Sequence, residues 1–245
     1  MNPRVHVYTV CWNEERFLPY FLRHYATFAE RITVFDNMSD DRSAEIVRSF
    51  AGARLQTFDT GGTFRDDVHR DLKNHAWKQS RGQADWVICV DVDELLWHPR
   101  PLDYLASRKS RSITILVPTG YEMLAENFPT TSGQVYDEVK YGAFNSEYSK
   151  PCIFNPDALA EINYIPGAHQ AQPIGLVIAE PQSELKLLHF RFLGTDYALE
   201  RFASKRARLS EENKRWGWGM HYEMPDDKIL AYMNRFQARR VQVVP

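Results

Sequence analysis

The stretch Trp86-Val87-Ile88-Cys89-Val90-Asp91-Val92-Asp93-Glu94 decides the fold. Five apolar residues in a row are typical of a strand buried on both faces, and the acids after them mark where it ends. Two carboxylates at positions i and i+2 after a buried strand raise each other's cost of ionisation unless a cation lies between them. Oxygen ligands of this kind suit Mg²⁺ or Mn²⁺, which in turn bind substrate phosphates.

Further β-rich runs accompany this strand in the first half of the chain, with helix-period segments between them. The runs lie at 5–11, 31–35, 54–58 and 113–117. Apolar residues recur at helical spacing over Phe17 to Phe28 and over Asp66 to Arg81, and a shorter helix is expected over 44–50, after the capping residue Ser43. Strands that alternate with helices predict a mostly parallel α/β sheet with right-handed crossovers.

The second half of the chain has a different character. From Gly120 to Pro173 it is rich in Gly, Pro, Asn and Tyr, with only weak strand signals. An apolar run returns at 185–192, and helices are expected over 197–209 and 226–239. Because no repeat or linker divides the chain, we interpret 1–245 as one domain. Its residues 1–119 are the nucleotide-binding-like half, and the irregular residues 120–245 carry specificity.

Composition and charge exclude several classes of protein. The 245 residues are 44% hydrophobic and 25% charged, with a net charge of −2. This excludes collagen, coiled coil and long disorder, and the near-neutral charge argues against nucleic acid as a partner. Neither a signal peptide nor a stretch of about 18 apolar residues is present, so a cytoplasmic protein is expected. Three distant cysteines predict buried free thiols: Cys11, Cys89 and Cys152.

Polar residues follow all of the first four predicted strands. The clusters are Trp12-Asn13-Glu14, Asp36 to Asp41, Asp59 to Asp67, and Asp91 to Glu94. Asp, Asn and Gly also terminate strands and cap helices, which explains any one cluster but explains four in succession less well. Because ligands of open α/β sheets bind beyond the carboxyl ends of the strands, these clusters predict a ligand site.

The residues Asn13-Glu14, Phe35-Asp36-Asn37-Met38-Ser39-Asp40 and Val90-Asp91-Val92-Asp93-Glu94 resemble the GT-A glycosyltransferases. The resemblance is closest to family 2-like members and to the layout of glycosyltransferase family 92. It covers roughly residues 5–96, and it continues more weakly through 149–151, 167–169 and 188–191. It implies a GT-A, Rossmann-like fold: a mostly parallel sheet flanked by helices, with the acceptor side in the C-terminal half. The DxD triplet specifies the chemistry better than the substrate.

The resemblance also implies residue roles. The first strand end and the second-strand Asp hold the nucleoside of a nucleoside-diphosphate sugar, and the DxD residues hold Mn²⁺ or Mg²⁺ and the diphosphate. Asn37 stands where many family 2 enzymes have a second acid, which weakens any claim about which nucleobase the donor carries. Basic residues complete the donor set by neutralising the diphosphate. The donor-binding residues are Thr9, Asn13, Glu14, Asp36, Arg65, Lys73, Asp91, Lys150 and Arg191. The metal ligands are Asp91, Asp93 and, as preferred third ligand, His189.

Acceptor-side residues are expected in the second half. An inverting transfer needs a carboxylate to remove the acceptor proton, and Glu122 after the strand at 113–117 occupies about that place. Asp137 and Glu138 are alternatives, and Glu122 is as readily an exposed loop residue. His169, Trp216 and Trp218 are candidate acceptor contacts, although each is equally a structural residue. The basic stretch 201–215 is a solvated helix face or, less often, a contact for anionic lipids at a membrane surface.

The sequence therefore predicts a metal-dependent, inverting, hexosyltransferase-type enzyme of polysaccharide biosynthesis, acting on a glycan, a lipid-linked acceptor or another hydroxyl. Retention at the anomeric carbon is the alternative, because GT-A enzymes do both. A DxD phosphatase is a weaker alternative because its motif usually lies near the N-terminus and has Thr or Val where Leu95 stands. A sugar nucleotidyltransferase would need a glycine-rich, basic loop after the first strand. A carbohydrate-binding module on a transferase fold is the non-enzymatic alternative, against which the intact Asp36, Asp91 and Asp93 argue.

Overall fold

The computed structural model describes residues 2–180 and 183–245. Its larger sheet has the strand order β3-β2-β1-β4-β9-β6. The first four strands are mutually parallel, whereas β9 is antiparallel to both of its neighbours. The strands are β1 (Val5–Cys11), β2 (Arg31–Asp36), β3 (Ala53–Thr57), β4 (Trp86–Cys89), β6 (Ile115–Leu116) and β9 (Ile153–Phe154). All of the strands predicted in the first half are present, although β6 is shorter than predicted.

Helices cover both faces of this sheet because alternate residues of its strands are apolar on both sides. Val5 and Val7 of β1 pack in one buried cluster with Phe17, next to α1 (Leu18–Tyr25), and with α2 (Ser43–Ser49). Tyr8 of β1 packs on the opposite face with Trp77 of η1 (Ala76–Ser80), which follows α3 (Asp66–His75). The predicted α/β class, with a parallel-rich Rossmann-like sheet between helices, is confirmed.

A second, five-stranded sheet occupies much of the half that was predicted to be irregular. Its order is β13-β8-β7-β12-β5, with β12 parallel to β7 and antiparallel to β5. The strand signal for β7 is weak in the sequence because this strand contains a glycine and a buried acid. The glycine is required there, since a Cβ atom at Gly120 would lie 2.4 Å from the backbone of Tyr148. The strands are β5 (Glu94–Trp97), β7 (Thr119–Ala125), β8 (Tyr141–Phe144), β12 (Lys186–Leu193) and β13 (Val241–Gln242).

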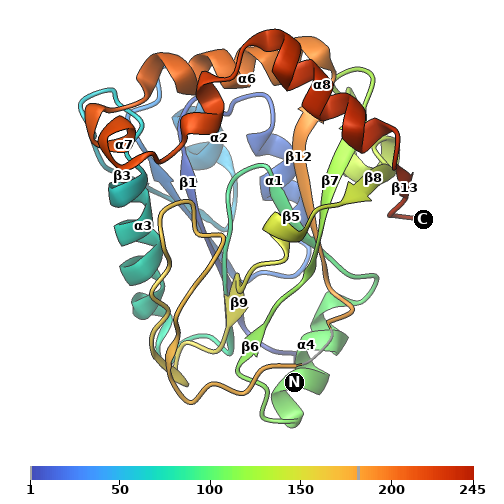
Figure 1. The fold of residues 1–245 in the computed structure, drawn as a ribbon. Helices are drawn as coiled ribbons and strands as arrows, with labels where there is room; N and C mark the ends of the chain where they lie inside the picture. The colour runs from blue at the N-terminus through green and yellow to red at the C-terminus, as the bar shows by residue number, and fades with distance from the viewer. Residues whose placement is uncertain (1, 181–182) are drawn as a thin grey trace.

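The C-terminal helices form a layer across one end of the molecule, over the carboxyl end of β1, while α4 (Pro101–Ser110) lies near the N-terminus at the other end (Figure 1). The two helices predicted here are confirmed as α6 (Thr195–Arg208) and α8 (Asp226–Gln237). In residues 2–180 and 183–245, no helix combines the length and apolarity needed to span a bilayer. The shorter elements are α5 (Val135–Glu138), η2 (Ser146–Tyr148), β10 (Leu159–Glu161), β11 (Ile174–Gly175), α7 (Glu211–Trp216) and η3 (Met220–Glu223).

One buried apolar cluster draws on both halves of the chain. Val5 and Phe17 from the first half pack in it with Leu187 and Phe190 of β12. The three cysteines are buried free thiols, as predicted: Cys11, Cys89 and Cys152. The two sheets therefore share a core, and the carboxyl end of β4, which leads directly into β5, lies where they meet.

Candidate active site

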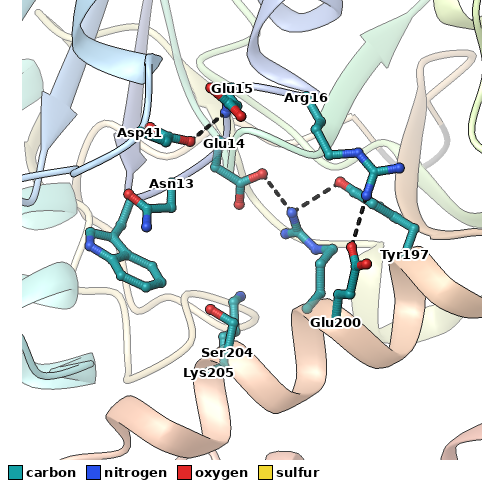
Figure 2. Close-up of a pocket in the computed structure, with 11 residues that line it drawn as sticks. Asn13, Glu14, Glu15, Arg16, Asp41, Tyr197, Glu200, Ser204 and Lys205 are labelled. Atoms are coloured by element: carbon teal, nitrogen blue, oxygen red, sulfur yellow. Dashed lines mark hydrogen bonds and ion pairs between the residues drawn. The ribbon is translucent and has the colours of Figure 1, made fainter.

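A cavity of about 190 Å³ lies at the carboxyl end of β1, between the β1–α1 loop and α6. Figure 2 shows Glu14 of the loop facing the helix, with Tyr197, Glu200 and Lys205 along the facing side of α6. Arg201 of the same helix donates to the Glu14 carboxylate at 2.5 Å and to the Tyr197 hydroxyl at 3.1 Å. The polar carboxyl end of β1 is therefore covered by α6, a helix from the C-terminal part of the chain.

The two aspartates of the DxD triplet follow β4 and are held by cations from distant elements. Asp93 accepts from Arg201 at 2.7 Å, and its carboxylate lies 3.4 Å from Nε2 of His189. Asp91 accepts from Lys73 of α3 at 2.6 Å. Burial alone would raise the pKa of Asp93, but Arg201 and His189 together hold it well below its usual value. Both carboxylates are therefore ionised and paired within the protein.

A buried lysine–glutamate pair fixes the same strand end. Lys150 and Glu94 are almost completely inaccessible, and their charged groups lie 2.6 Å apart. The second oxygen of Glu94 accepts the main-chain N–H of Asp91 at 2.9 Å, while Nζ of Lys150 lies 4.0 Å from the Asp91 carboxylate. Burial would lower the pKa of Lys150, but Glu94 and Asp91 raise it, so the ammonium stays charged. This pair orients Asp91 and adds a cation beside it.

Glu122, the predicted catalytic base, does not fit that role. It lies inside β7 and is completely buried, because the register of β7 against β12 sets it opposite His189. One oxygen lies 2.8 Å from Nδ1 of His189, and the other accepts from Arg191 at 2.8 Å. Neither an acceptor hydroxyl nor solvent reaches this carboxylate. Between Glu122 and Asp93, the pKa of His189 rises to about 9 despite its burial, so its ring is an imidazolium.

The alternative bases are also engaged elsewhere. Asp137 closes a capping box with Gln134 at the start of α5, and Glu138 accepts the main-chain N–H of Thr130. The segment around α5 contacts α1, where Arg23 donates to the carbonyl of Gly133. Both acids thus stabilise local turns beside α1.

The predicted metal ligands do not form a ready coordination site. Over the described residues, no three His, Cys, Asp or Glu side chains are grouped so as to hold a metal ion. His189 faces a carboxylate with each ring nitrogen, so it has no lone pair for a metal. A divalent ion at Asp91 and Asp93 would compete with Lys73 and Arg201, which already pair with these carboxylates. This arrangement does not fit the predicted three-ligand site, and the metal requirement stays a prediction.

The fold has a counterpart among solved structures. The chain is similar to S. aureus TarS, with a TM-score of 0.51 and 15% identity over 94% of this chain and 42% of that one. It also aligns with TarS 1–349 in complex with UDP, at a TM-score of 0.48 and 13% identity over 94% of this chain and 70% of that one. No protein-family model and no curated protein sequence matches the chain. At such low identity the first alignment shows the fold alone, and the chain spans less than half of that TarS structure.

The ends of β1 and β2 meet as predicted. The Asn13 side chain and Asp40 exchange two hydrogen bonds, at 2.5 and 3.0 Å. Asp36 is buried, and its carboxylate accepts the main-chain N–H and the hydroxyl of Ser39. Asn13 adopts a left-handed conformation with φ of 50°, which turns the chain sharply after β1. Asn13, Asp36 and Glu14 therefore lie at one edge of the sheet, next to the DxD end of β4.

Other predicted residues lie apart from this edge. Thr9 is buried on the same face of β1 as Val7, and Arg65 pairs with its neighbour Asp67. Trp216 and Trp218 stack at 6.0 Å at the end of α7, which is joined to the start of α3 through the buried Asn213–Asp66 hydrogen bond. Arg191 of β12 lies among aromatic rings and is bound to Glu122.

Sequence reasoning missed two cations and one ring of the site. Arg201 and Lys205 were interpreted as part of a solvated basic face, but both line the cavity, and Lys205 donates to the Tyr222 hydroxyl at 3.0 Å. Their signal was the spacing of four residues from Tyr197 to Arg201 and again from Arg201 to Lys205, which places all three on one helix face. Tyr148, whose ring stacks on His189 at 3.9 Å, had no signal in the sequence.

Proposed function

We propose that this chain is a glycosyltransferase that moves a sugar from a nucleoside-diphosphate donor to a hydroxyl group of a glycan or lipid-linked acceptor. The observation that carries the proposal is the cluster of cations at the end of β4. Lys73, Lys150 and Arg201 each lie within 4.0 Å of Asp91 or Asp93. Cations gathered at the carboxyl end of a central parallel strand suit a ligand with several negative charges, such as a diphosphate. The TarS-like fold supports the same class.

The mechanism we propose uses these cations on the leaving group. As the bond between the anomeric carbon and the diphosphate oxygen breaks, negative charge grows on that oxygen, and prepositioned ammonium and guanidinium groups stabilise it. Asp91, Asp93 and Glu94 hold the cations in place in the free protein. Inversion at the anomeric carbon then requires one displacement by the acceptor hydroxyl. A divalent ion, Mn²⁺ or Mg²⁺, would add to this neutralisation, but no step proposed here depends on it.

Contact with a membrane surface has less support. Four residues of the predicted basic stretch are used within the molecule: Arg201, Lys205, Arg206 and Arg208. Arg206 donates to main-chain carbonyls of Tyr222 and Met224, and Arg208 covers the ring of Trp12 at 3.3 Å. Few basic side chains of this stretch are therefore left for anionic lipids.

The donor role is tested by thermal shift against UDP, GDP, CDP and dTDP sugars, with and without Mn²⁺. We expect one nucleotide class to raise the melting temperature, because a ligand that binds only the native state stabilises it. Lys73→Met should weaken this shift by removing a diphosphate contact, whereas Lys214→Met on the exposed side of α7 should leave it unchanged. Release of the free nucleoside diphosphate then reports turnover.

Each result separates the competing functions. No shift and no consumption of any donor would rule out the donor role. If the protein binds a sugar but releases no nucleoside diphosphate, whether the sugar is offered water or an acceptor, the result would favour the carbohydrate-binding module.

A further inference from the structure

A strained loop tip presents one histidine beside the site. The loop is closed by hydrogen bonds between Ile165 and Gln170 and between Gln172 and Asn163. At its tip Gly167 and Ala168 both adopt left-handed conformations, with φ of 81° and 53°. An alanine in that conformation is uncommon and costs energy, so its surroundings must hold it there. The Ala168 methyl group is buried in the cluster that contains Trp77, and the next residue, His169, is exposed.

The hydrogen bond of His169 fixes which ring nitrogen is free. Its Nδ1 lies 2.9 Å from the main-chain carbonyl oxygen of Glu147. A carbonyl oxygen only accepts, so Nδ1 carries the proton. In the neutral ring Nε2 then has an unshared electron pair, and no group in the described part of the chain forms a hydrogen bond with it. This is the arrangement of a histidine base whose tautomer is set by a main-chain carbonyl.

His169 is separated from the charged site by one aromatic ring. It packs edge-on against Tyr148, with ring centroids 5.4 Å apart. His189 also packs on Tyr148, stacking on its ring at 3.9 Å, and faces Asp93. Nζ of Lys150 lies 5.8 Å from the centre of the same ring. Tyr148 thus lies between the ring of His169 and the charged groups of the proposed diphosphate site, and His169 stands outside the set of residues that line the cavity.

We propose that His169 is the general base of the transfer reaction. Its Nε2 removes the proton of the acceptor hydroxyl while the hydroxyl oxygen forms a bond to the anomeric carbon. The bond from that carbon to the diphosphate oxygen breaks, and its electron pair leaves with the nucleoside diphosphate. The resulting imidazolium then returns its proton to water. The inference rests on the proposed glycosyltransferase function and gives the transfer the accessible base that Glu122 does not provide.

The surroundings of His169 keep it ready to accept a proton. Burial of part of the ring and the Lys150 ammonium lower its pKa below the usual value, so the ring is neutral near pH 7. The hydrogen bond to Glu147 and the charges of Glu94 and Asp91 oppose this shift without reversing it. Several titratable groups lie around the His169 ring. They are Glu147 and Tyr148 of η2, the nearby Lys150, Asp91 and Glu94 after β4, and His221 of η3.

The test compares His169→Gln with Gln170→Ala, a neighbouring exposed residue of the same loop. Loss of a general base lowers kcat by roughly 10²–10⁴-fold. We expect that loss for His169→Gln with donor affinity unchanged, and wild-type kcat for Gln170→Ala. In the wild type, kcat/KM should fall as pH drops below the pKa of His169, because protonation removes the base. This acid limb should disappear in His169→Gln.

His169→Ala provides a second measurement, in which added imidazole should restore part of the transfer rate by entering the vacated space. A His169→Gln enzyme within a few-fold of wild-type kcat, or one that keeps the acid limb, would overturn the base assignment while leaving the proposed function intact. A wild-type protein that binds no nucleotide sugar in the thermal-shift test would instead overturn the proposed function, and the base assignment with it.

Discussion

The ends of β2 and β4 both place acids at the same edge of the sheet, but they stabilise them differently. Asp36, the last residue of β2, accepts from the main-chain N–H and the hydroxyl of Ser39, three residues along the chain. Asp91 and Asp93 after β4 are held by Lys73 and Arg201, which lie 18 and 108 positions away. The first acid needs only its own turn, whereas the acids of β4 depend on charges that the whole fold brings together.

The largest effect is expected at the buried pair behind β4. Lys150→Met leaves the Glu94 carboxylate uncompensated in a site from which water is excluded. Removal of one partner of a buried ion pair costs about 3–5 kcal/mol. We therefore expect the free energy of unfolding, measured by urea denaturation, to fall by about that amount.

The double variant Glu94→Gln/Lys150→Met is the matched control. Glutamine keeps an oxygen that accepts the Asp91 N–H, and no charge is left unpaired. Most of the lost stability should return. If the double variant is as unstable as Lys150→Met, the cost comes from lost packing around Lys150 and not from the unpaired charge.

The same contrast explains what the sequence predicts. Strand positions, the acidic strand ends and the turn at Asp36 follow from local signals: apolar runs, strand-ending residues and a hydrogen bond between residues three positions apart. The position of Asp91 and Asp93 after β4 follows in the same way. These features are read within a window of a few residues.

The partners of the β4 acids could not be read in this way. Glu122 and His189 are 67 positions apart, and only the register of β7 against β12 makes them neighbours. That register depends on the pairing of two strands that are far apart in the chain, and β7 contains a glycine and a buried acid that weaken its strand signal. Arg201 is the same residue type as the exposed Arg215 of the same basic stretch, and its burial is set by how α6 packs over the end of β1.

A smaller effect is expected at the β2 end. Asp36→Ala removes the acceptor of two hydrogen bonds but leaves no buried charge behind, so stability should fall by about 1–2 kcal/mol. Asp36→Asn, which keeps one acceptor oxygen, should lose less. A loss from Asp36→Ala as large as that from Lys150→Met, in the same urea titrations, would show that the Asp36 turn also depends on distant charges.

The smallest effect is expected one position from Arg201 on α6, where Glu200 pairs with Arg16 at 2.8 Å. This distance is close to that of the Arg201–Asp93 pair, but the Arg16 and Glu200 side chains are 47% and 66% exposed. Water already stabilises both charges, and Arg16 remains stacked on Phe128 at 4.4 Å without its partner. Exposed pairs contribute at most about 1 kcal/mol, so Glu200→Gln should change stability by less than about 0.5 kcal/mol, and by less still in 1 M salt, where the Debye length is about 3 Å. A loss above about 2 kcal/mol would mean that distance rather than burial sets the strength of these pairs.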